Sequence, residues 1–332
     1  MTAALVSVVI PVYNGERFVA QAIESVLAQT WPNLEVVAVN DGSTDSSAEV
    51  LGRYEGRIVT LHQNNRGVAE ARNAGIRRAR GEFIAFLDQD DWWRPEKLSR
   101  QVPVMLNNPR VGLVHSAADH YDDASGQWTE PLFPLALQSQ LVGDCFRQLL
   151  KGNVIYNSSV LVRTAAIIEA GLCDTDIRGN TVQDYDLWLR VARRWELAYV
   201  PERLAVFRVH SGQGTWNRPL LLSEEARLLE RVLVAEKLTD DSEMRARMAS
   251  LYDQLGTAYL DAGQWRMARS SFGRSCQWRV TTRARLLYWI CCFPGPVIRM
   301  LQWLSHHRPW VRRSVSARLA TSVARSGGHN TG

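Results

Sequence analysis

The sequence predicts an α/β fold in which a mainly parallel, mixed sheet is flanked by helices, with a helical appendage at the C-terminal end. Two observations predict it. Short apolar segments rich in β-branched residues alternate with segments of helical periodicity through the first third of the chain, and the periodicity of residues 218–281 is helical. At 332 residues, with 46% hydrophobic and 22% charged side chains, the composition is that of a globular protein.

Four segments are expected to form buried strands because they are short and almost continuously apolar, at 6–12, 34–39, 57–62 and 82–87. The intervening helices are expected at 16–29, 45–54 and 67–80. Ligands of such sheets bind beyond the carboxyl ends of the strands, so the chemistry is expected where strands end.

Polar clusters follow three of these strands, at 11–16 ("PVYNGE"), 40–45 ("NDGSTD") and 88–93 ("DQDDWW"). In the second cluster, Ser43, Thr44 or Asp45 is suited to capping the next helix. Asp41 precedes the cap, so a structural role explains it less well.

In the third cluster, Asp88 and Asp90 are two residues apart at a strand end, where a turn of the backbone can make their carboxylates converge. Hard divalent cations prefer such oxygen ligands and keep positions open for phosphates, so the pair indicates Mn²⁺ or Mg²⁺ holding a diphosphate. The alternative is a solvated acidic turn in which Asp90 or Asp91 caps the helix expected at 94–106.

The stretch "VSVVIPVYNGERFVAQAIESVLAQTWPNLEVVAVNDGSTDSS", with the later "GVAEARNAGIRRARGEFIAFLDQDDWWRPEKL", resembles family 2 glycosyltransferases, which are inverting enzymes of the GT-A fold. The resemblance covers roughly residues 5–217. It implies a Rossmann-like GT-A domain with a nucleotide-sugar-binding half at 1–110 and an acceptor and catalytic-base half at 111–217. A helical region at 218–281 and a basic amphipathic tail at 282–332 would follow.

The resemblance also implies roles for individual residues. The base pocket would be lined by Pro11, Val12, Tyr13 and Asn14, Asp41 would hydrogen-bond the base, and Arg72, Asn73 and Gln89 would lie beside the nucleotide. Asp88 and Asp90 match the family's Asp-x-Asp metal motif, with Asp88 nearer the ribose or the metal shell. Asp91 and Trp92 would border the sugar and acceptor side, while Ala71 and Gly75 would serve close helix packing.

The segment "TVQDYDLWLRVARRW" (181–195) is expected to begin a helix with Asp184 and Asp186 near its N-terminus, where the helix dipole favours negative charge. It resembles the family's E-D-x-D-L-W-x-R stretch, which makes Asp184 the general base that deprotonates the acceptor hydroxyl. Gln183 stands where the family has Glu. The alternative for Asp184 is a helix cap only, and Asp186 is expected to cap or to form a salt bridge.

The segment "LAVFRVHSGQGTW" (204–216) is expected to be a strand followed by a glycine-rich loop. It resembles the family's Y-R-x-H segment, with Phe207 in place of the tyrosine, so His210 would complete the metal or diphosphate site. A lone histidine without that context is more often a packed or surface residue.

Charge is distributed unevenly along the chain. No acidic residue follows Asp261, whereas 12 Lys and Arg do, so the first 261 residues carry 27 basic and 34 acidic groups. Residues 255–272 resemble one tetratricopeptide repeat, which is expected to pack against the catalytic domain. The basic, tryptophan-bearing tail is expected either to lie at an anionic membrane surface or to form a packed helix with a disordered end.

The expected function is transfer of a sugar from a nucleoside-diphosphate donor, UDP-linked, to a hydroxyl of a saccharide or a polyprenyl-lipid-linked saccharide, as in the synthesis of cell-surface polysaccharide. Transfer is expected to be non-processive, since the sequence has no spanning segment and no downstream Q-x-x-R-W. One alternative is a nucleotidyltransferase, but "PVYNGERF" of this chain is a poor match to the glycine-rich loop of that class. The other is a degenerate sugar-nucleotide-binding module without transfer activity. A nucleic-acid partner is not expected.

The N-terminus lacks the pattern of a signal peptide, and the five cysteines show neither CxxC spacing nor an even number. We therefore expect reduced thiols and a cytoplasmic protein, peripheral at the inner face of the membrane.

Overall fold

The computed structural model describes residues 3–212 and 217–292. The chain divides into two compact units, residues 1–238 and 239–332. Helix α9 (Arg218–Ala235) therefore belongs to the first unit, whereas the sequence placed a boundary at 217.

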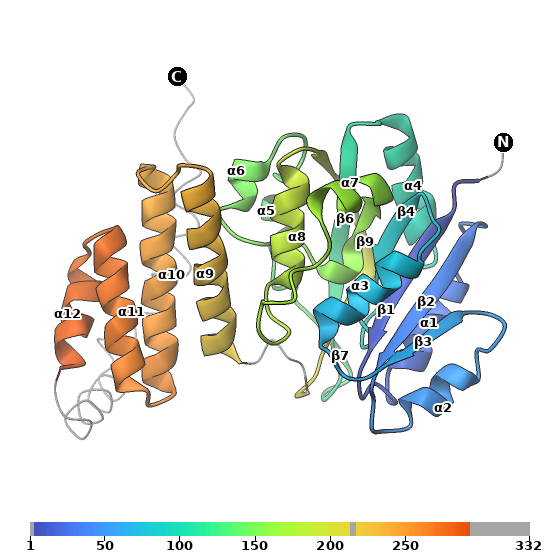
Figure 1. The fold of residues 1–332 in the computed structure, drawn as a ribbon, viewed down its shortest axis with the longest axis horizontal. Helices are drawn as coiled ribbons and strands as arrows, with labels where there is room; N and C mark the ends of the chain where they lie inside the picture. Colours follow the sequence, from blue (N-terminus) through green and yellow to red (C-terminus); the bar gives the residue numbers. More distant parts are fainter. Residues whose placement is uncertain (1–2, 213–216, 293–332) are drawn as a thin grey trace. The chain divides into compact units, whose positions relative to one another are not determined.

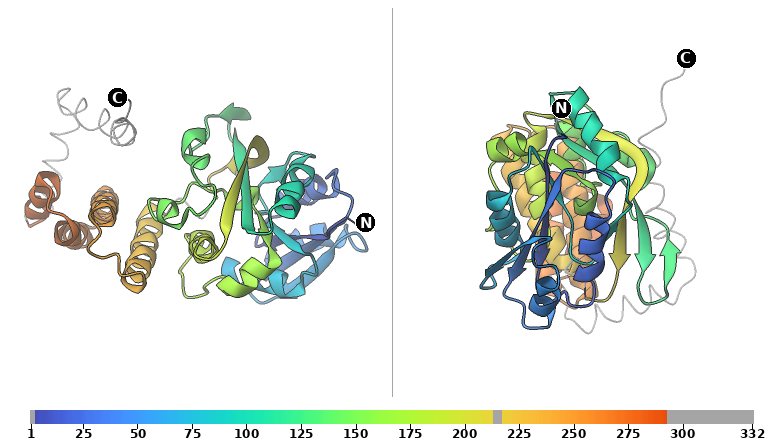
Figure 2. Two further views of the ribbon diagram at one scale, coloured as in Figure 1. Left: turned by 90° about the horizontal axis from the view of Figure 1, so that it is seen from above. Right: turned by 90° about the vertical axis from the view of Figure 1, so that its right-hand side faces the viewer.

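The first unit is built on one mixed sheet, which has nine strands in the described part of the chain (Figures 1 and 2). The strand order is β3-β2-β1-β4-β8-β6-β9-β5, and β7 pairs with β6. The strands are β1 (Val6–Val12), β2 (Leu34–Asp41), β3 (Val59–Gln63), β4 (Phe83–Phe86), β5 (Trp92–Trp93), β6 (Val111–Asp122), β7 (Gln127–Thr129), β8 (Leu161–Arg163) and β9 (Glu196–Val209). The expected α/β fold is confirmed.

Strands β1 to β4 pair in parallel and correspond to the four strands expected from the sequence. Beyond β4 the sheet becomes mixed, because β8 runs antiparallel to both β4 and β6. Since the carboxyl ends of parallel neighbours meet at one edge, the polar clusters that follow β1, β2 and β4 are brought together.

Helices cover both faces of this sheet. One face carries α1 (Val19–Leu27), α2 (Ser47–Gly52) and α4 (Lys97–Asn107), which share a core with the β1 residues Val8 and Ile10. The other face carries α3 (Val68–Arg78), α7 (Thr164–Ala170) and α8 (Gln183–Ala192), drawn in front of the sheet in Figure 1. Short helices α5 (Leu135–Gln138), α6 (Phe146–Leu149) and η1 (Asn157–Ser159) connect the later strands.

Strand periodicity explains how both faces are filled, because Val9 points away from the face that Val8 occupies. A Cβ atom on Gly75 of α3 would lie only 2.3 Å from Val9 Cγ1. Helix α3 therefore approaches β1 as closely as it does because residue 75 has no side chain, which confirms the packing role expected for Gly75.

The second unit is helical, with α10 (Ser242–Asp261), α11 (Trp265–Trp278) and α12 (Thr282–Ile290). Asp241 caps α10 by accepting hydrogen bonds from the backbone of Glu243 and Met244. Phe272 packs against Gly256, where a Cβ would lie 2.7 Å from its ring. None of the described helices is long and apolar enough to cross a membrane. The expected tail from residue 293 onward lies outside the described residues.

Candidate active site

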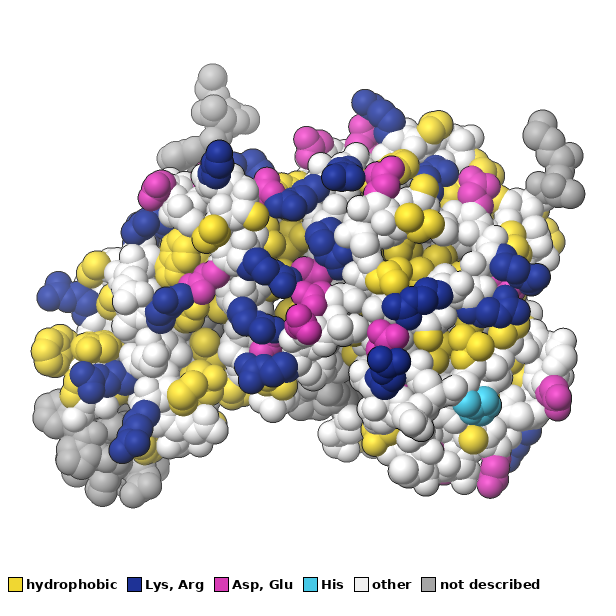
Figure 3. All heavy atoms as spheres, in the orientation of Figure 1, with side chains coloured by type: hydrophobic (Ala, Val, Ile, Leu, Met, Phe, Trp, Pro, Cys, Tyr) yellow, Lys and Arg dark blue, Asp and Glu magenta, His cyan; other side chains and the backbone are white. Residues whose placement is uncertain are grey.

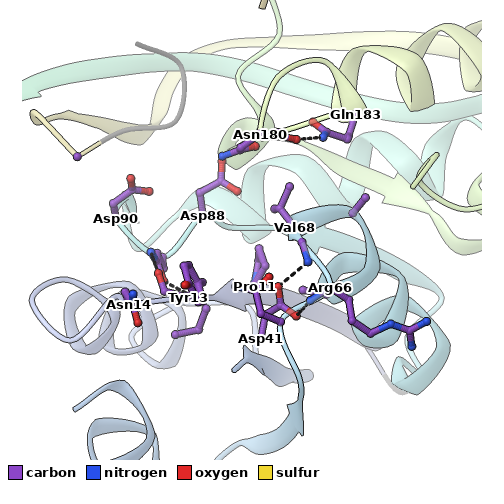
Figure 4. A pocket seen from close by; sticks show the side chains of 18 of the residues that line it. Pro11, Tyr13, Asn14, Asp41, Arg66, Val68, Asp88, Asp90, Asn180 and Gln183 are labelled. Atoms are coloured by element: carbon purple, nitrogen blue, oxygen red, sulfur yellow. Dashed lines mark hydrogen bonds between the residues drawn. The ribbon is translucent and has the colours of Figure 1, made fainter. Parts of the chain in front are cut away.

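A cavity of about 910 Å³ lies in the first unit at the carboxyl edge of the sheet (Figure 4). It gathers side chains from the three polar strand ends, from α3, from the loop before α8 and from the end of β9. The predicted site residues in its lining are Pro11, Val12, Tyr13, Asn14, Asp41, Asp88, Gln89, Asp90 and His210. Segments as far apart in sequence as Pro11 and Gly212 therefore converge on one space.

The loops after β1 and β2 hold each other in place. Asn14 adopts a left-handed conformation (φ 49°), which asparagine tolerates better than most residues. Its backbone N–H donates to Ser43 Oγ at 3.0 Å, and its side-chain oxygen accepts from the backbone of Thr44 at 2.8 Å. Ser43 and Thr44 thus fix the Asn14 loop, and Asp45 accepts from the backbone of Ser47 at the start of α2 at 3.0 Å.

Asp41 is nearly buried and organises the loop that leads into α3. Its carboxylate accepts hydrogen bonds from Gln63 Nε2 (2.7 Å) and from the backbone N–H groups of Arg66 (2.9 Å) and Gly67 (2.8 Å). A carboxylate has about four acceptor positions, so one remains for a ligand. Asp41 can therefore shape the cavity wall and also accept a hydrogen bond from a base.

Gln89 ties the loop after β4 to the loop after β1. Its amide donates to Tyr13 O at 3.0 Å and accepts from Tyr13 N at 2.9 Å. A Cβ atom on Gly15 would lie 2.2 Å from the same amide oxygen, so only glycine permits this approach. The two loops consequently behave as one wall of the cavity.

Asp90 and His210 are in contact, with 2.9 Å between Asp90 Oδ2 and His210 Nε2. Cis ligands of an octahedral ion at about 2.1 Å are about 3 Å apart, so this spacing fits a shared Mg²⁺ or Mn²⁺. Arg208 supports the pair by donating from Nε to Asp90 O at 2.8 Å. In the described residues, no group of three or more His, Cys, Asp or Glu is arranged as a complete metal site.

Asp88 is held by two side chains from other elements. Its Oδ1 accepts from Arg72 at 2.8 Å and from Asn157 Nδ2 at 2.9 Å, and the residue lines the cavity. Arg72 is 4% exposed and does not line the cavity. It lies close enough to Asp184 to interact with it electrostatically, so one guanidinium connects the predicted metal side to the predicted base.

Asn73 is also buried and lies outside the lining of the cavity. Its amide donates to Cys173 O at 3.0 Å and accepts from Cys173 N at 2.8 Å. In this structure Asn73 therefore anchors the loop that precedes α8, and its role beside a nucleotide stays a prediction.

Asp91 and Trp92, expected on the sugar and acceptor side, also lie outside the cavity lining. Asp91 is buried, where it accepts from Ser158 Oγ at 2.6 Å and from the backbone of Arg208 at 3.0 Å. Burial, together with the nearby Asp90 and Asp88 charges, holds its pKa well above the usual range. Trp92 packs against Tyr121 and under the Arg208 guanidinium.

Asp184 is the second residue of α8 and not its cap, because the helix begins at Gln183. Its Oδ1 accepts from the backbone of Tyr185 at 2.8 Å. Burial raises the pKa of Asp184 to about 6, an effect that the positive charge of Arg72 partly opposes. Gln183 lines the cavity, whereas Asp184, the next residue of α8, lies outside the lining and close enough to Arg72 and Asp88 to interact with them electrostatically. A carboxyl group with this pKa is suited to accept a proton near neutral pH.

Asp186 forms salt bridges, which is one of the two roles, capping or salt bridging, that the sequence predicted for it. Its carboxylate binds Arg190 at 2.6 Å and Arg231 of α9 at 3.0 Å. Asp186 thus holds α8 to α9 and does not take part in the cavity.

Sequence reasoning did not name the loop residues before α8 that line the cavity. These are Thr175, Ile177, Arg178, Gly179 and Asn180. Figure 4 shows Asn180 and Gln183 across the cavity from Pro11 and Asp41. Only an acceptor-facing loop was expected here, because this segment carries no motif.

The model of the family described as glycosyl transferase family 2 matches residues 7–172 of the chain. The chain belongs to this family. An "uncharacterized glycosyltransferase" of Rickettsia felis is 33% identical over 217 residues, which are 64% of this chain and 35% of that protein. One of Rickettsia prowazekii is 32% identical over 213 residues, 64% of this chain and 66% of that protein. The chain spans about a third of the length of the R. felis relative.

Solved structures share the fold of this family 2 chain. The crystal structure of S. aureus TarS 1-349 has a TM-score of 0.60 at 18% identity, covering 85% of this chain and 82% of TarS 1-349. The mannosyltransferase PcManGT from Pyrobaculum calidifontis, in complex with GDP-Man and Mn²⁺, has a TM-score of 0.56 at 16% identity, covering 90% and 87%. At these identities the likeness confirms the GT-A-like fold.

Proposed function

We propose that this chain is an inverting, divalent-metal-dependent glycosyltransferase that moves a sugar from a nucleoside-diphosphate donor to a hydroxyl of a saccharide or lipid-linked saccharide. The observation that carries the proposal is the convergence of Asp41, Asp88, Asp90 and His210 on one cavity. Asp184 follows the cavity-lining Gln183 in α8 and interacts electrostatically with Asp88. Family membership supports sugar transfer as the class of reaction. A degenerate module would be expected to lack the acidic residues that this cavity retains.

Each part of the cavity has a proposed role. The loop 11–14 and Asp41 bind the base, and Asp90 with His210, assisted by Asp88, holds Mn²⁺ or Mg²⁺. The cation, when bound, offsets the negative charge that develops on the departing diphosphate. Asp184 accepts the proton of the acceptor hydroxyl on the opposite side of the sugar, which gives inversion.

UDP is the proposed nucleotide of the donor. A TarS structure is described as a complex with UDP-GlcNAc, and PcManGT as one with GDP-Man and Mn²⁺. A thermal-shift screen of UDP- and GDP-sugars, with and without Mn²⁺, tests the proposal. We expect stabilisation by UDP-sugars that depends on Mn²⁺. Stabilisation by none of these ligands would contradict the donor-binding function.

We also propose a cytoplasmic enzyme that lies peripherally at an anionic membrane surface, through the second unit. Helix α12 exposes Leu286 (60%) and Trp289 (62%), and the second unit presents basic side chains on the face seen in Figure 3. Exposed apolar side chains next to cations suit a membrane interface. Binding of this surface would bring the enzyme to a polyprenyl-linked acceptor.

Sedimentation with phosphatidylglycerol vesicles tests this membrane proposal. We expect the full chain to co-sediment with these vesicles and not with phosphatidylcholine vesicles. The double variant Leu286→Gln/Trp289→Gln should lose at least half of the bound fraction. Ile168→Gln is the matched control, because Ile168 is 68% exposed but lies on α7 of the first unit. Equal binding by the double variant and the wild type would refute the assignment.

A further inference from the structure

A nearly buried carboxylate on α9 lies behind one wall of the cavity. Glu224 is 1% exposed, and its two oxygens are bound by two different arginines. Arg178 donates from Nε to Oε1 at 2.8 Å, and Arg227 donates to Oε2 at 2.6 Å. A buried carboxylate is costly unless it is paired, so Glu224 holds both guanidinium groups in place.

Of these two arginines, only Arg178 lines the cavity. Its side chain is 71% exposed although its Nε is anchored on Glu224. In the part of the chain that the structure describes, Nη1 and Nη2 of Arg178 have no hydrogen-bond partner. The side chain is thus fixed at one edge and presents two unused N–H-bearing nitrogens.

The backbone that carries Arg178 is also held by several contacts. Arg227 donates to Asp176 O at 2.9 Å, and Arg231 binds Asp174 at 2.9 Å. Gln183, at the start of α8, donates to Ile177 O at 3.2 Å. A binding group supported this way loses little conformational freedom when a ligand arrives, which favours affinity.

We propose that Arg178 binds a phosphate group in this cavity through Nη1 and Nη2, while Glu224 positions it. A planar guanidinium with two nitrogens available matches two oxygens of a phosphate. The proposal rests on the proposed glycosyltransferase function and adds a specificity-determining residue to it. The phosphate belongs either to the diphosphate of the donor or to the lipid phosphate of an acceptor.

Titration calorimetry with Mn²⁺ present, using UDP, uridine and farnesyl phosphate as probes, tests the proposal and separates the two sources. The variant is Arg178→Gln. The matched control is Arg80→Gln, which also removes an exposed arginine from a largely buried carboxylate, that of Glu35, but lies outside the cavity lining. Removing one charged hydrogen bond, which contributes about 1.5 to 3 kcal/mol, lowers the affinity for the phosphate ligand by about 10-fold to 100-fold.

We expect Arg178→Gln to weaken the affinity for UDP by that factor and to leave the affinity for uridine unchanged, with Arg80→Gln within about threefold of the wild type for both. This result assigns the donor diphosphate. A loss confined to farnesyl phosphate assigns the acceptor phosphate and still supports the proposal. Unchanged affinity for both phosphates, or equal losses in the two variants, overturns it.

The melting temperature of each variant identifies a folding defect, and Arg178→Lys provides a second test. Lysine retains the charge but not the fork, so it should recover only part of the phosphate affinity. Full recovery by lysine would overturn the two-nitrogen geometry. If the wild type binds neither UDP nor farnesyl phosphate, the proposed function falls together with this inference. If the wild type binds UDP, and Arg178→Gln binds UDP and farnesyl phosphate as tightly as the wild type does, only this inference is overturned.

Discussion

Asp184→Asn is expected to lower kcat by about 10³-fold while leaving the Kd of the donor within about threefold of the wild-type value. Asparagine has nearly the same shape as aspartate but cannot accept the proton of the acceptor hydroxyl. Donor contacts are proposed for other residues, so donor binding should persist. Initial rates with a saturating UDP-sugar and a calorimetric titration with UDP measure the two quantities. Full transfer activity in this variant would show that Asp184 is not the base.

The raised pKa of Asp184 gives two further expectations for the same variant. Transfer by the wild type should fall as the pH drops through about 6, where the base becomes protonated. The pKa rises from 3.8 to about 6, so the folded state binds the proton more tightly than the unfolded chain. The stability that this proton supplies is fully present below about pH 4 and is lost as the pH rises through about 6.

At pH 7.5 the ionised, buried Asp184 therefore costs the fold about 3 kcal/mol at most. Asp184→Asn removes this cost, so its melting temperature should exceed that of the wild type by several degrees at pH 7.5. The difference should disappear below about pH 4. A melting temperature below that of the wild type at pH 7.5 would contradict the proposed origin of the pKa shift, which is burial.

Asp186→Asn is the matched comparison, because it makes the same chemical change two residues along α8. Asp186 is paired with Arg190 and Arg231, so its loss should destabilise the fold and lower the melting temperature. Its folded fraction should retain transfer activity. A higher melting temperature with lost activity in Asp184→Asn, and a lower melting temperature with retained activity in Asp186→Asn, would distinguish the base from the structural acid.

The sequence predicted the parts of the site that follow from regular geometry. Asp41 ends β2, and Asp88 and Asp90 come shortly after β4, so their meeting at one edge required only the strand order. Glu35 illustrates the limit of such reasoning. It lies in β2, yet it pairs with Arg80 after α3, a contact that depends on how the helix crosses the sheet.

The remaining parts depend on long-range packing that leaves no local pattern. Asp91 is next to Asp90 in the same acidic run, but the turn directs its carboxylate to Ser158 and away from the cavity. Glu224 lies in a segment for which the sequence predicted only a helix, and only the structure shows it buried against Arg178. The membership of α9 in the first unit was missed for the same reason.

Asp90→Ala is expected to abolish the dependence of donor binding on metal and to lower kcat by at least about 10²-fold. In the wild type, Mn²⁺ should increase the affinity for UDP, because the cation links the diphosphate to the Asp90 and His210 pair. Without the Asp90 carboxylate, His210 and Asp88 together are too few ligands to hold the cation, because Asp88 Oδ1 is already bound by Arg72 and Asn157. UDP should therefore bind with the same low affinity with Mn²⁺ or with EDTA. Calorimetry under the two conditions measures the difference.

Glu96→Gln is the control for Asp90→Ala, because Glu96 is an exposed acid six residues further along, outside the cavity lining. It should keep both the activity and the enhancement by Mn²⁺. His210→Gln should lose part of the enhancement, since the second member of the pair is replaced while Asp90 remains. If Asp90→Ala kept the wild-type response to Mn²⁺, the cation would have to bind elsewhere, and the contact between Asp90 and His210 would be structural only.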